Sequence, residues 1–214
     1  MTQTIINLDQ YTLTSVPLTL FCNGHEIGKA TGFFYKSNGE VFLVSNWHVF
    51  SGRNCNDGQP HHTSSAIPDT IKFPICKKGE IGRFIDASIN LYENERAVWF
   101  QHGELGQDCD VAVLRMIGAN SDEVEFYSLP VEDDQSNMML RVSMDVFILG
   151  YPEGATHWGA MPVWKRESIA SEPEFRLGGR PFFLVDSATR PGMSGSPVIL
   201  EVLVAISLAI AVLL

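Results

Sequence analysis

The sequence predicts an all-β fold, and three observations point to that class. The 18 glycines and 11 prolines of this 214-residue chain are spread along its whole length, which favours many turns. Between the turns lie short apolar segments, several of them rich in β-branched and aromatic residues, as expected of strands. The pair Asn23–Gly24, which joins two such segments, is typical of a tight β-hairpin.

The expected strands fall into two groups along the chain. A polar arm over residues 1–14 precedes the first group, which occupies residues 15–116. Residues 117–140 contain most of the dense acidic sequence together with glycine, asparagine and serine, so we expect a linker there. The second group occupies residues 141–200. The expected strands are residues 18–22, 27–35, 41–44, 71–75, 81–89, 97–100, 110–116, 142–149, 161–170, 182–185 and 198–200.

Composition and charge exclude some classes of protein. The formal net charge is −10 and no basic cluster offsets it, so no nucleic-acid partner is expected. The four cysteines are widely spaced, and the pair His61–His62 lies in a polar loop over residues 51–70 without a further ligand at useful spacing. We therefore expect neither a metal nor a cofactor. Residues 1–10 lack the pattern of a signal peptide, so a cytoplasmic location is expected.

Three segments contain residue types that suit nucleophilic catalysis. Residues 192–197 read Gly-Met-Ser-Gly-Ser-Pro, which places Ser194 between glycines on a tight turn before an apolar run. Upstream, His48 lies at the end of the apolar run 42–49, and Asp110 opens a second apolar run. The order along the chain is therefore histidine, aspartate, serine, which is one of the known orders of a catalytic triad.

Residues 44–49, 110–114 and 192–197 together resemble the three signature blocks of trypsin-like serine peptidases. The similarity is greatest to the bacterial branch that includes glutamyl-endopeptidase-like and HtrA-like enzymes, and it covers about residues 15–200. The resemblance implies two packed antiparallel β-barrels of the six-stranded type, with the active site between them. It also implies a serine endopeptidase that acts on peptide or protein substrates.

The resemblance assigns a role to each motif residue. A serine hydroxyl is a weak nucleophile at neutral pH, so His48 is expected to take the proton of Ser194 as it attacks. Asp110 is expected to orient the imidazole and to stabilise its protonated form. The backbone N–H groups of Gly192 and Ser194 are expected to form the oxyanion hole.

Each of two motif residues has a competitor two positions away. Asp108 would share a strand face with Asp110, but Asp110 is the residue directly before the Val-Ala-Val-Leu run, as in the family. Ser196 follows Ser194, and the family motif selects Ser194 as the nucleophile. We expect the hydroxyl of Ser196 to make a structural hydrogen bond.

By resemblance, residues 186–191 line the primary substrate pocket. Family members that cleave after lysine or arginine have an aspartate six residues before the nucleophile, and here that position holds Ala188. Trypsin-like basic specificity is therefore not supported. Thr189 is a candidate polar contact to the substrate, and an ordinary loop threonine is the alternative.

The chain departs from the family after Pro197. Residues 201–214 form an atypical apolar tail, uncharged over residues 202–214, where a trypsin-like domain normally continues much further. The second barrel is therefore expected to be incomplete. The tail is interpreted as an abnormal or truncated end, as a strand or helix that completes the barrel by an unusual route, or as a membrane anchor.

Two consequences follow from this tail. A helix over residues 202–214 would span roughly 20 Å against a hydrocarbon core of about 30 Å, so a membrane partner is not expected. The missing pocket wall also keeps an alternative function open. In that alternative the chain is a catalytically impaired pseudo-peptidase that binds extended peptides by strand addition.

Overall fold

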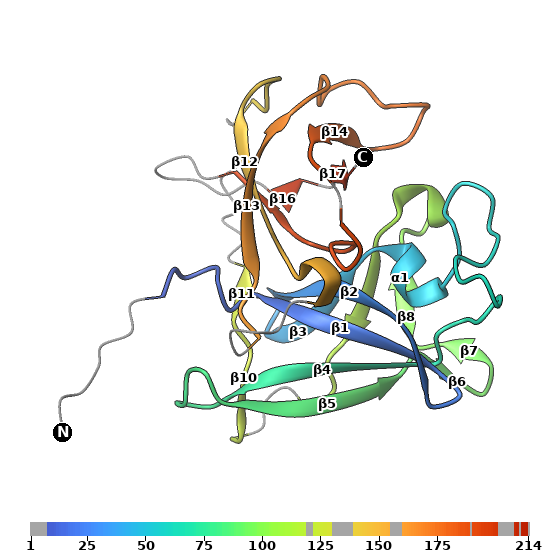
Figure 1. The fold of residues 1–214 in the computed structure, drawn as a ribbon, viewed down its shortest axis with the longest axis vertical. Coiled ribbons are helices and arrows are strands. Elements are labelled where there is room, and N and C mark those ends of the chain that lie inside the picture. The colour runs from blue at the N-terminus through green and yellow to red at the C-terminus, as the bar shows by residue number, and fades with distance from the viewer. Residues whose placement is uncertain are drawn as a thin grey trace.

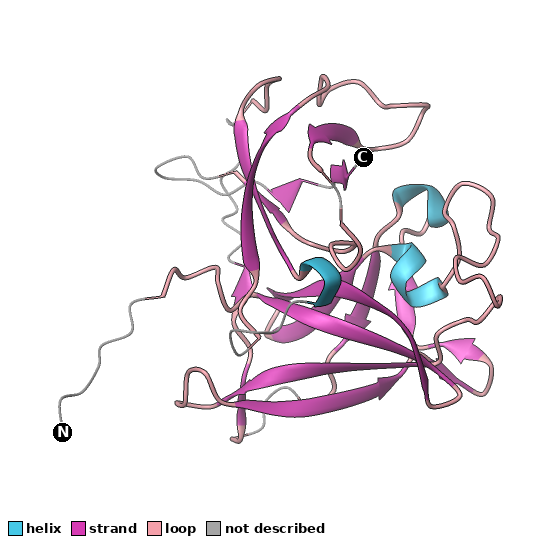
Figure 2. Cartoon of the chain, in the orientation of Figure 1, coloured by secondary structure: helices cyan, strands magenta, loops and turns pink. Residues whose placement is uncertain are grey.

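The computed structural model describes residues 8–118, 122–129, 139–154, 160–188, 190–200, 208–209 and 211–213. Within these residues the protein is almost entirely β-structure with a few short helical turns (Figure 2). Its strands form two main sheets, one from each half of the chain. In Figure 1 the orange and red strands of the second half lie above the blue and green strands of the first half. The predicted all-β class is confirmed.

The first sheet contains nine strands and provides most of the scaffold. Its path is β10-β4-β1-β2-β3-β9-β8, with β5 paired to β4 and β11 paired to β2. The strands are β1 (Ser15–Cys22), β2 (His25–Ser37), β3 (Glu40–Ser45), β4 (Thr70–Lys77), β5 (Phe84–Asn90), β8 (Trp99–Gln101), β9 (Ala112–Arg115), β10 (Val124–Glu125) and β11 (Ser128–Leu129). A separate hairpin joins β6 (Tyr92–Glu93) to β7 (Arg96–Ala97).

The turn between β1 and β2 has the backbone that its sequence predicts. Asn23 and Gly24 both have positive φ, at 51° and 78°. Two successive residues in this region make a two-residue turn whose twist matches that of the flanking antiparallel strands. The turn thus fixes the β1–β2 register, in which Cys22 lies opposite His25.

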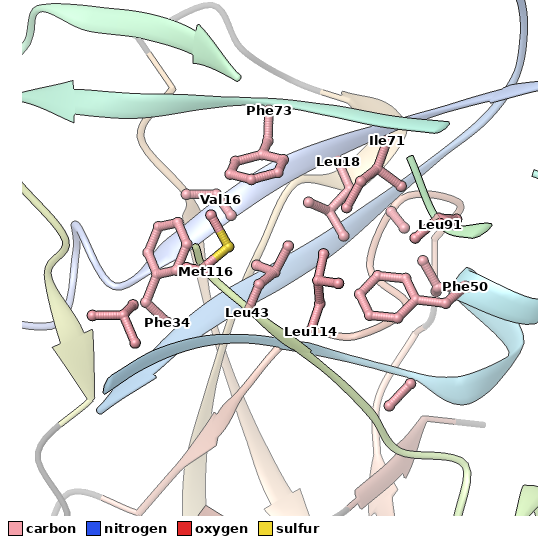
Figure 3. Packing of buried hydrophobic residues seen from close by; sticks show 14 of the residues in the cluster. Val16, Leu18, Phe34, Leu43, Phe50, Ile71, Phe73, Leu91, Leu114 and Met116 are labelled. Carbon is pink, nitrogen blue, oxygen red and sulfur yellow. The ribbon is translucent and has the colours of Figure 1, made fainter. Parts of the chain in front are cut away.

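A single apolar core lies inside the first sheet (Figure 3). Leu18 from β1, Leu43 from β3 and Ile71 from β4 are fully buried in it, and Phe34 lies near Phe73 with ring centroids 6.2 Å apart. Strands that meet around one core from several directions must curl, so the sheet closes toward a barrel. This core holds the strand ends that carry the candidate site.

The second sheet contains six strands in the order β16-β15-β12-β13-β14-β17. They are β12 (Asp145–Gly150), β13 (Val163–Ile169), β14 (Phe183–Asp186), β15 (Val198–Ile199), β16 (Leu208–Ala209) and β17 (Ala211–Leu213). In the described residues the edge strands β16 and β17 do not pair with each other, so this barrel is incomplete. Both edge strands come from the expected apolar tail, and each pairs with a strand of the sheet.

Apolar side chains from both halves form the interface between the sheets. Phe33 and Leu129 come from the first sheet, Leu149 and Ile199 come from the second, and Tyr11 joins them from the segment before β1. Trp164 of β13 packs against this cluster. The interface therefore fixes the two sheets against each other beside the candidate site.

Two expected boundaries differ from the arrangement seen. Residues 117–140 were expected as a linker, yet β10 and β11 lie within this range and pair with β4 and β2. Residues 1–14 were expected as an arm, yet Tyr11 and Thr14 are buried. Among the described residues, only Leu129 is buried in the first of these stretches and only Tyr11 and Thr14 in the second, so the polar composition of each stretch gave no sign of them. The described residues contain no helix with the length and apolar character needed to cross a membrane.

Candidate active site

His48 lies on a one-turn helix directly after β3. The helix, α1 (Trp47–Ser51), ends at Gly52, whose N–H donates to the carbonyl of His48 at 3.0 Å. Gly52 has a φ of 65°, and a Cβ there would lie 2.3 Å from the ring of Pro68. Glycine is therefore required for the chain to end the helix and return past residues 67–68. The strand and the helix together hold the His48 backbone in a fixed position.

Asp110 is the hydrogen-bond partner of His48. The short helix η1 (Gln107–Cys109) ends at Asp110, which is buried and has a left-handed backbone with φ of 48°. Its carboxylate accepts hydrogen bonds from Nδ1 of His48 at 2.9 Å and from the backbone N–H of His48 at 3.0 Å. A carboxylate on Nδ1 holds the proton there and leaves Nε2 as the basic nitrogen.

The competing aspartate, Asp108, has a different partner. Its carboxylate lies 3.1 Å from Nη2 of Arg180, a residue of the long connection between β13 and β14. The side chains of Asp108 and Asp110 therefore contact different residues. Of the two, the structure brings Asp110 to His48.

Ser194 lies in the turn between β14 and β15, which β2 holds in place. In Figure 1 this red turn reaches down to the first sheet beside α1. The N–H of Thr31 donates to the carbonyl of Ser194 at 2.8 Å, and the Thr31 hydroxyl donates to the carbonyl of Gly192 at 2.8 Å. Two carbonyl groups of the turn are thus fixed on β2. Within the described parts of the chain, the N–H groups of Gly192 and Ser194 have no acceptor.

Gly195 fits its position because it has no side chain. Its φ is 84°, and a Cβ would lie 2.1 Å from both the hydroxyl of Ser45 and the carbonyl oxygen of Thr31. Any larger residue would push the turn away from β2 and β3. The glycine at this position of the motif therefore allows the backbone of the turn to lie close to β2 and β3.

Sequence reasoning missed three polar residues that connect the motifs. Asn46 donates from Nδ2 to the carbonyl of Asp110 at 2.9 Å and accepts from the N–H of Gly195 at 2.5 Å. Ser45 donates its hydroxyl to the carbonyl of Thr31 at 2.7 Å. Thr31 and Ser45 are buried polar residues within apolar strands, and buried polar groups need partners. The position of these polar residues within apolar strands was the sequence feature that could have indicated such contacts.

His48 and Ser194 come together at one cavity. Both residues line a cavity of about 200 Å³. Among the described residues, no hydrogen bond joins the hydroxyl of Ser194 to the ring of His48. Catalytic hydrogen bonds are often long in unliganded sites and tighten only around substrate.

The expected primary-pocket segment is only partly described, because Thr189 lies outside the described residues. Ala188 is exposed, and its carbonyl accepts a hydrogen bond from Nζ of Lys165 at 2.7 Å. The same ammonium lies 3.0 Å from the hydroxyl of Ser187 and 2.9 Å from the carboxylate of Glu167. Lys165 and Glu167 share one face of β13. They hold the segment before the nucleophile, a role that the sequence gave no reason to expect.

Ser196 is not bonded as expected. Its hydroxyl is buried and has no hydrogen-bond partner among the described residues. It lies so close to Gly150 that a Cβ on Gly150 would be 2.0 Å away. The small space left by Gly150 therefore accommodates the hydroxyl without giving it an acceptor.

Burial and charge shift the pKa values of side chains around His48. Burial, and then the charge of His48, lowers the pKa of His61. Burial, and then the charge of Asp110, raises the pKa of the Cys55 thiol. These shifts favour the neutral imidazole of His61 and the protonated thiol of Cys55. The described part of the chain holds no group of three or more His, Cys, Asp or Glu side chains placed to bind a metal.

Comparisons with known proteins agree with this geometry. The family described as trypsin-like peptidase domain matches residues 30–202 of the chain. Among solved structures, the serine endoprotease from Yersinia pestis is similar at 14% identity with a TM-score of 0.52, and this similarity shows a chymotrypsin-like fold. The alignment covers 91% of this chain and 54% of that chain, so this chain spans about half its length. No curated protein matches the sequence.

Proposed function

The chain belongs to the trypsin-like peptidase family, and from this premise we propose that it is a serine endopeptidase with His48, Asp110 and Ser194 as its catalytic triad. The observation that carries the proposal is the cavity shared by Ser194 and His48, with Asp110 hydrogen-bonded to the far side of the His48 ring. Its substrates are peptides or proteins. In this proposal the protein supplies the three side chains and backbone N–H groups, and one water molecule is consumed per bond cleaved.

In the proposed reaction, Nε2 of His48 takes the proton of Ser194 while Oγ attacks the carbonyl carbon of the scissile bond. Asp110 stabilises the imidazolium that forms, and His48 then gives its proton to the leaving amine. The acyl group is left on Ser194 as an ester. A water molecule activated by His48 hydrolyses this ester and regenerates the serine.

We assign the oxyanion hole to the N–H groups of Gly192 and Ser194. Support comes from the absence of an acceptor for either N–H group among the described residues, and from the two hydrogen bonds by which Thr31 fixes the backbone of both residues on β2. Both N–H groups can therefore donate to the charge that develops on the substrate oxygen. Removing one such donor typically slows catalysis by about 10²–10³-fold.

The test is covalent labelling with a fluorophosphonate probe, read by intact mass. Oγ of the activated serine displaces fluoride from phosphorus and the hydroxyl proton is lost with it, so the labelled protein gains the mass of the probe minus HF. The parent chain is expected to take up one label. The variants Ser194→Ala and His48→Ala are expected to take up none on the same timescale.

Ser196→Ala is the matched control, because it removes the other serine of the motif, whose buried hydroxyl has no partner among the described residues. It should label like the parent. If Ser196→Ala loses labelling and Ser194→Ala keeps it, the nucleophile is Ser196 and the assignment of Ser194 is wrong. A folded parent that does not label would overturn the enzyme proposal and favour the non-catalytic peptide-binding module.

A further inference from the structure

Strand β13, which lies between β12 and β14 (Figure 1), has an ion pair on the face that it turns to the apolar core. Lys165 of β13 lies directly opposite Ile148 of β12. Two residues further along β13, Glu167 lies directly opposite Val146. Residues directly opposite on antiparallel strands share a face, and both β12 residues belong to the apolar core of the second sheet. The two charged side chains therefore lie on the core side of the sheet.

The ammonium of Lys165 is the centre of a hydrogen-bond network. Nζ lies 2.9 Å from Oε1 of Glu167, 3.0 Å from the hydroxyl of Ser187 and 2.7 Å from the carbonyl oxygen of Ala188. These three acceptors match the three hydrogens of an ammonium group. The Ser187 hydroxyl in turn donates to Oε1 of Glu167 at 3.2 Å. The side chains of Lys165 and Glu167 are only 20% and 16% exposed, so the network is largely shielded from water.

Stability alone does not explain an ion pair in this position. Removing two charges from water offsets most of their mutual attraction, so apolar side chains of similar volume stabilise a core as well or better. Ile169, the next residue on the same face of β13, is such an apolar side chain and is buried in the core. The contact of the pair with residues 187–188 supplies a functional explanation.

The network reaches the segment that we expect to line the primary substrate pocket. Ser187 and Ala188 belong to this segment, and Ala188 is exposed, so a substrate can contact it. Because the Lys165 ammonium is hydrogen-bonded to the Ala188 carbonyl, a substrate side chain at Ala188 comes close to this charge. The charge is balanced by Glu167, whose carboxylate contacts the same ammonium.

The other charged residues of segment 186–191 have different surroundings. Asp186 lies opposite Ser168 of β13, which is adjacent to Glu167 in the chain, and Asp186 therefore lies on the other face of the sheet. The guanidinium of Arg190 lies 3.9 Å from the carboxylate of Glu153. Among the described residues, the Lys165–Glu167 pair is therefore the charged group in contact with Ala188.

We propose that Lys165 and Glu167 determine the specificity of the primary pocket, which as a balanced ion pair they restrict to uncharged side chains. The inference rests on the proposed function, because it places a primary pocket before Ser194. A charged side chain that enters a shielded site loses hydration and needs an opposite charge in return. The pair offers no such charge, because each of its members already neutralises the other. The substrate class is therefore peptides with an uncharged residue at the bond that is cut.

The test is affinity selection of a positional peptide library on full-length Ser194→Ala, which cannot turn the peptides over. One position should favour uncharged over charged residues by about tenfold or more. Adding Lys165→Met leaves the Glu167 carboxylate unbalanced, so lysine and arginine should become enriched at that position. Adding Glu167→Gln leaves the Lys165 ammonium unbalanced, so aspartate and glutamate should become enriched instead. A pair that only supports the fold would give the same loss of selection in both variants.

Two controls separate local charge from folding and from total charge. The double change Lys165→Met with Glu167→Gln removes both charges and should restore the preference for uncharged residues. Arg166→Met removes a positive charge from the other face of β13, where Arg166 pairs with Asp145, and should leave the library profile unchanged. Urea unfolding of every variant identifies any that fails to fold. If Lys165→Met fails to fold, the nearly isosteric Glu167→Gln and the double variant still decide the question.

Three results would overturn the specificity proposal. They are a parent profile without a preference for uncharged residues, the same enrichment in Lys165→Met and Glu167→Gln, and an equal shift in Arg166→Met. Fluorophosphonate labelling of the same variants with Ser194 intact tests the enzyme proposal separately. A labelled parent whose variants keep one profile refutes the specificity proposal alone. An unlabelled parent whose variants shift in opposite directions refutes the enzyme proposal and supports the assigned role of the pair.

Discussion

At the scale of single residues, Gly195 of the motif 192–197 is required for two reasons. It has a positive φ of 84°, and it lies against two strands, where a Cβ would meet the Ser45 hydroxyl and the Thr31 carbonyl at 2.1 Å. These are groups of two buried residues and cannot move aside easily. The contact of the Gly195 backbone with β2 and β3 is therefore a condition for the Ser194 turn to reach the first sheet.

Gly195→Ala is expected to destabilise the fold and to remove fluorophosphonate labelling. A left-handed backbone alone costs about 1–3 kcal/mol for a residue with a Cβ, and the steric clash adds to that cost. Gly24→Ala is the matched control, because Gly24 has a similar φ of 78° with no atom within 4 Å of the added Cβ. Urea unfolding of both variants would give the difference. Equal losses of unfolding free energy would contradict the steric argument.

At the scale of elements, β2 connects the first sheet to the proposed oxyanion hole through Thr31. The hydroxyl of Thr31 donates to the carbonyl of Gly192 and accepts from the N–H of Tyr151 at 3.1 Å, and Thr31 is fully buried. Tyr151 follows β12, so one hydroxyl joins β2 to both the nucleophile turn and the second sheet. Burial also raises the pKa of Tyr151, whose hydroxyl lies 2.9 Å from the carbonyl of Ser15.

Thr31→Val is expected to slow fluorophosphonate labelling by about tenfold or more, because it keeps the shape of the side chain but leaves the Gly192 carbonyl and the Tyr151 N–H unpaired. Leaving a buried polar group unpaired costs about 1–3 kcal/mol, so some loss of stability should accompany the slower reaction. Thr31→Ser retains the hydroxyl and should recover most of the labelling rate. If Thr31→Val reacts at the parent rate, the Thr31 hydroxyl does not position the turn.

These elements also show how far sequence alone can lead. Most strands of the first sheet could be predicted because apolar alternation and turn pairs such as Asn23–Gly24 are local signals, whereas β10 and β11 lie in the expected linker and were missed. His48, Asp110 and Ser194 could be selected because His48 lies at the end of an apolar run and the other two each precede one. The contacts of Thr31 and Arg180 could not be predicted, since their partners lie 161 and 124 residues away and depend on how two sheets pack.

At the scale of the whole molecule, two kinds of contact hold the halves together. The apolar cluster around Phe33, Leu149 and Ile199 fixes the sheets on one side. Next to Asp110, the guanidinium of Arg180 reaches from the second half to Asp108, to the carbonyl of Cys55 at 3.4 Å and to the side chain of Asn56. Arg180 thus joins the β13–β14 connection to both loops that flank the proposed His48–Asp110 pair.

Arg180→Met is expected to loosen the contact between the β13–β14 connection and the two loops beside His48 and Asp110, without unfolding the protein. The ion pair with half-exposed Asp108 alone contributes less than about 1 kcal/mol, but the guanidinium also satisfies a carbonyl and an amide oxygen. Amide hydrogen exchange should therefore rise in residues 53–62 and 107–110, with little change in the strands of either core. Fluorophosphonate labelling should slow as the loop beside His48 becomes less ordered.

Two further variants separate charge from geometry at Arg180. Asp108→Asn removes only the ion pair, so its exchange pattern should stay close to that of the parent. Arg180→Lys keeps the positive charge but loses the planar fork that reaches several acceptors, so it should resemble Arg180→Met. If Arg180→Lys behaves like the parent, a single charge is sufficient to hold the loops. The multi-acceptor account of this contact between the two halves would then be wrong.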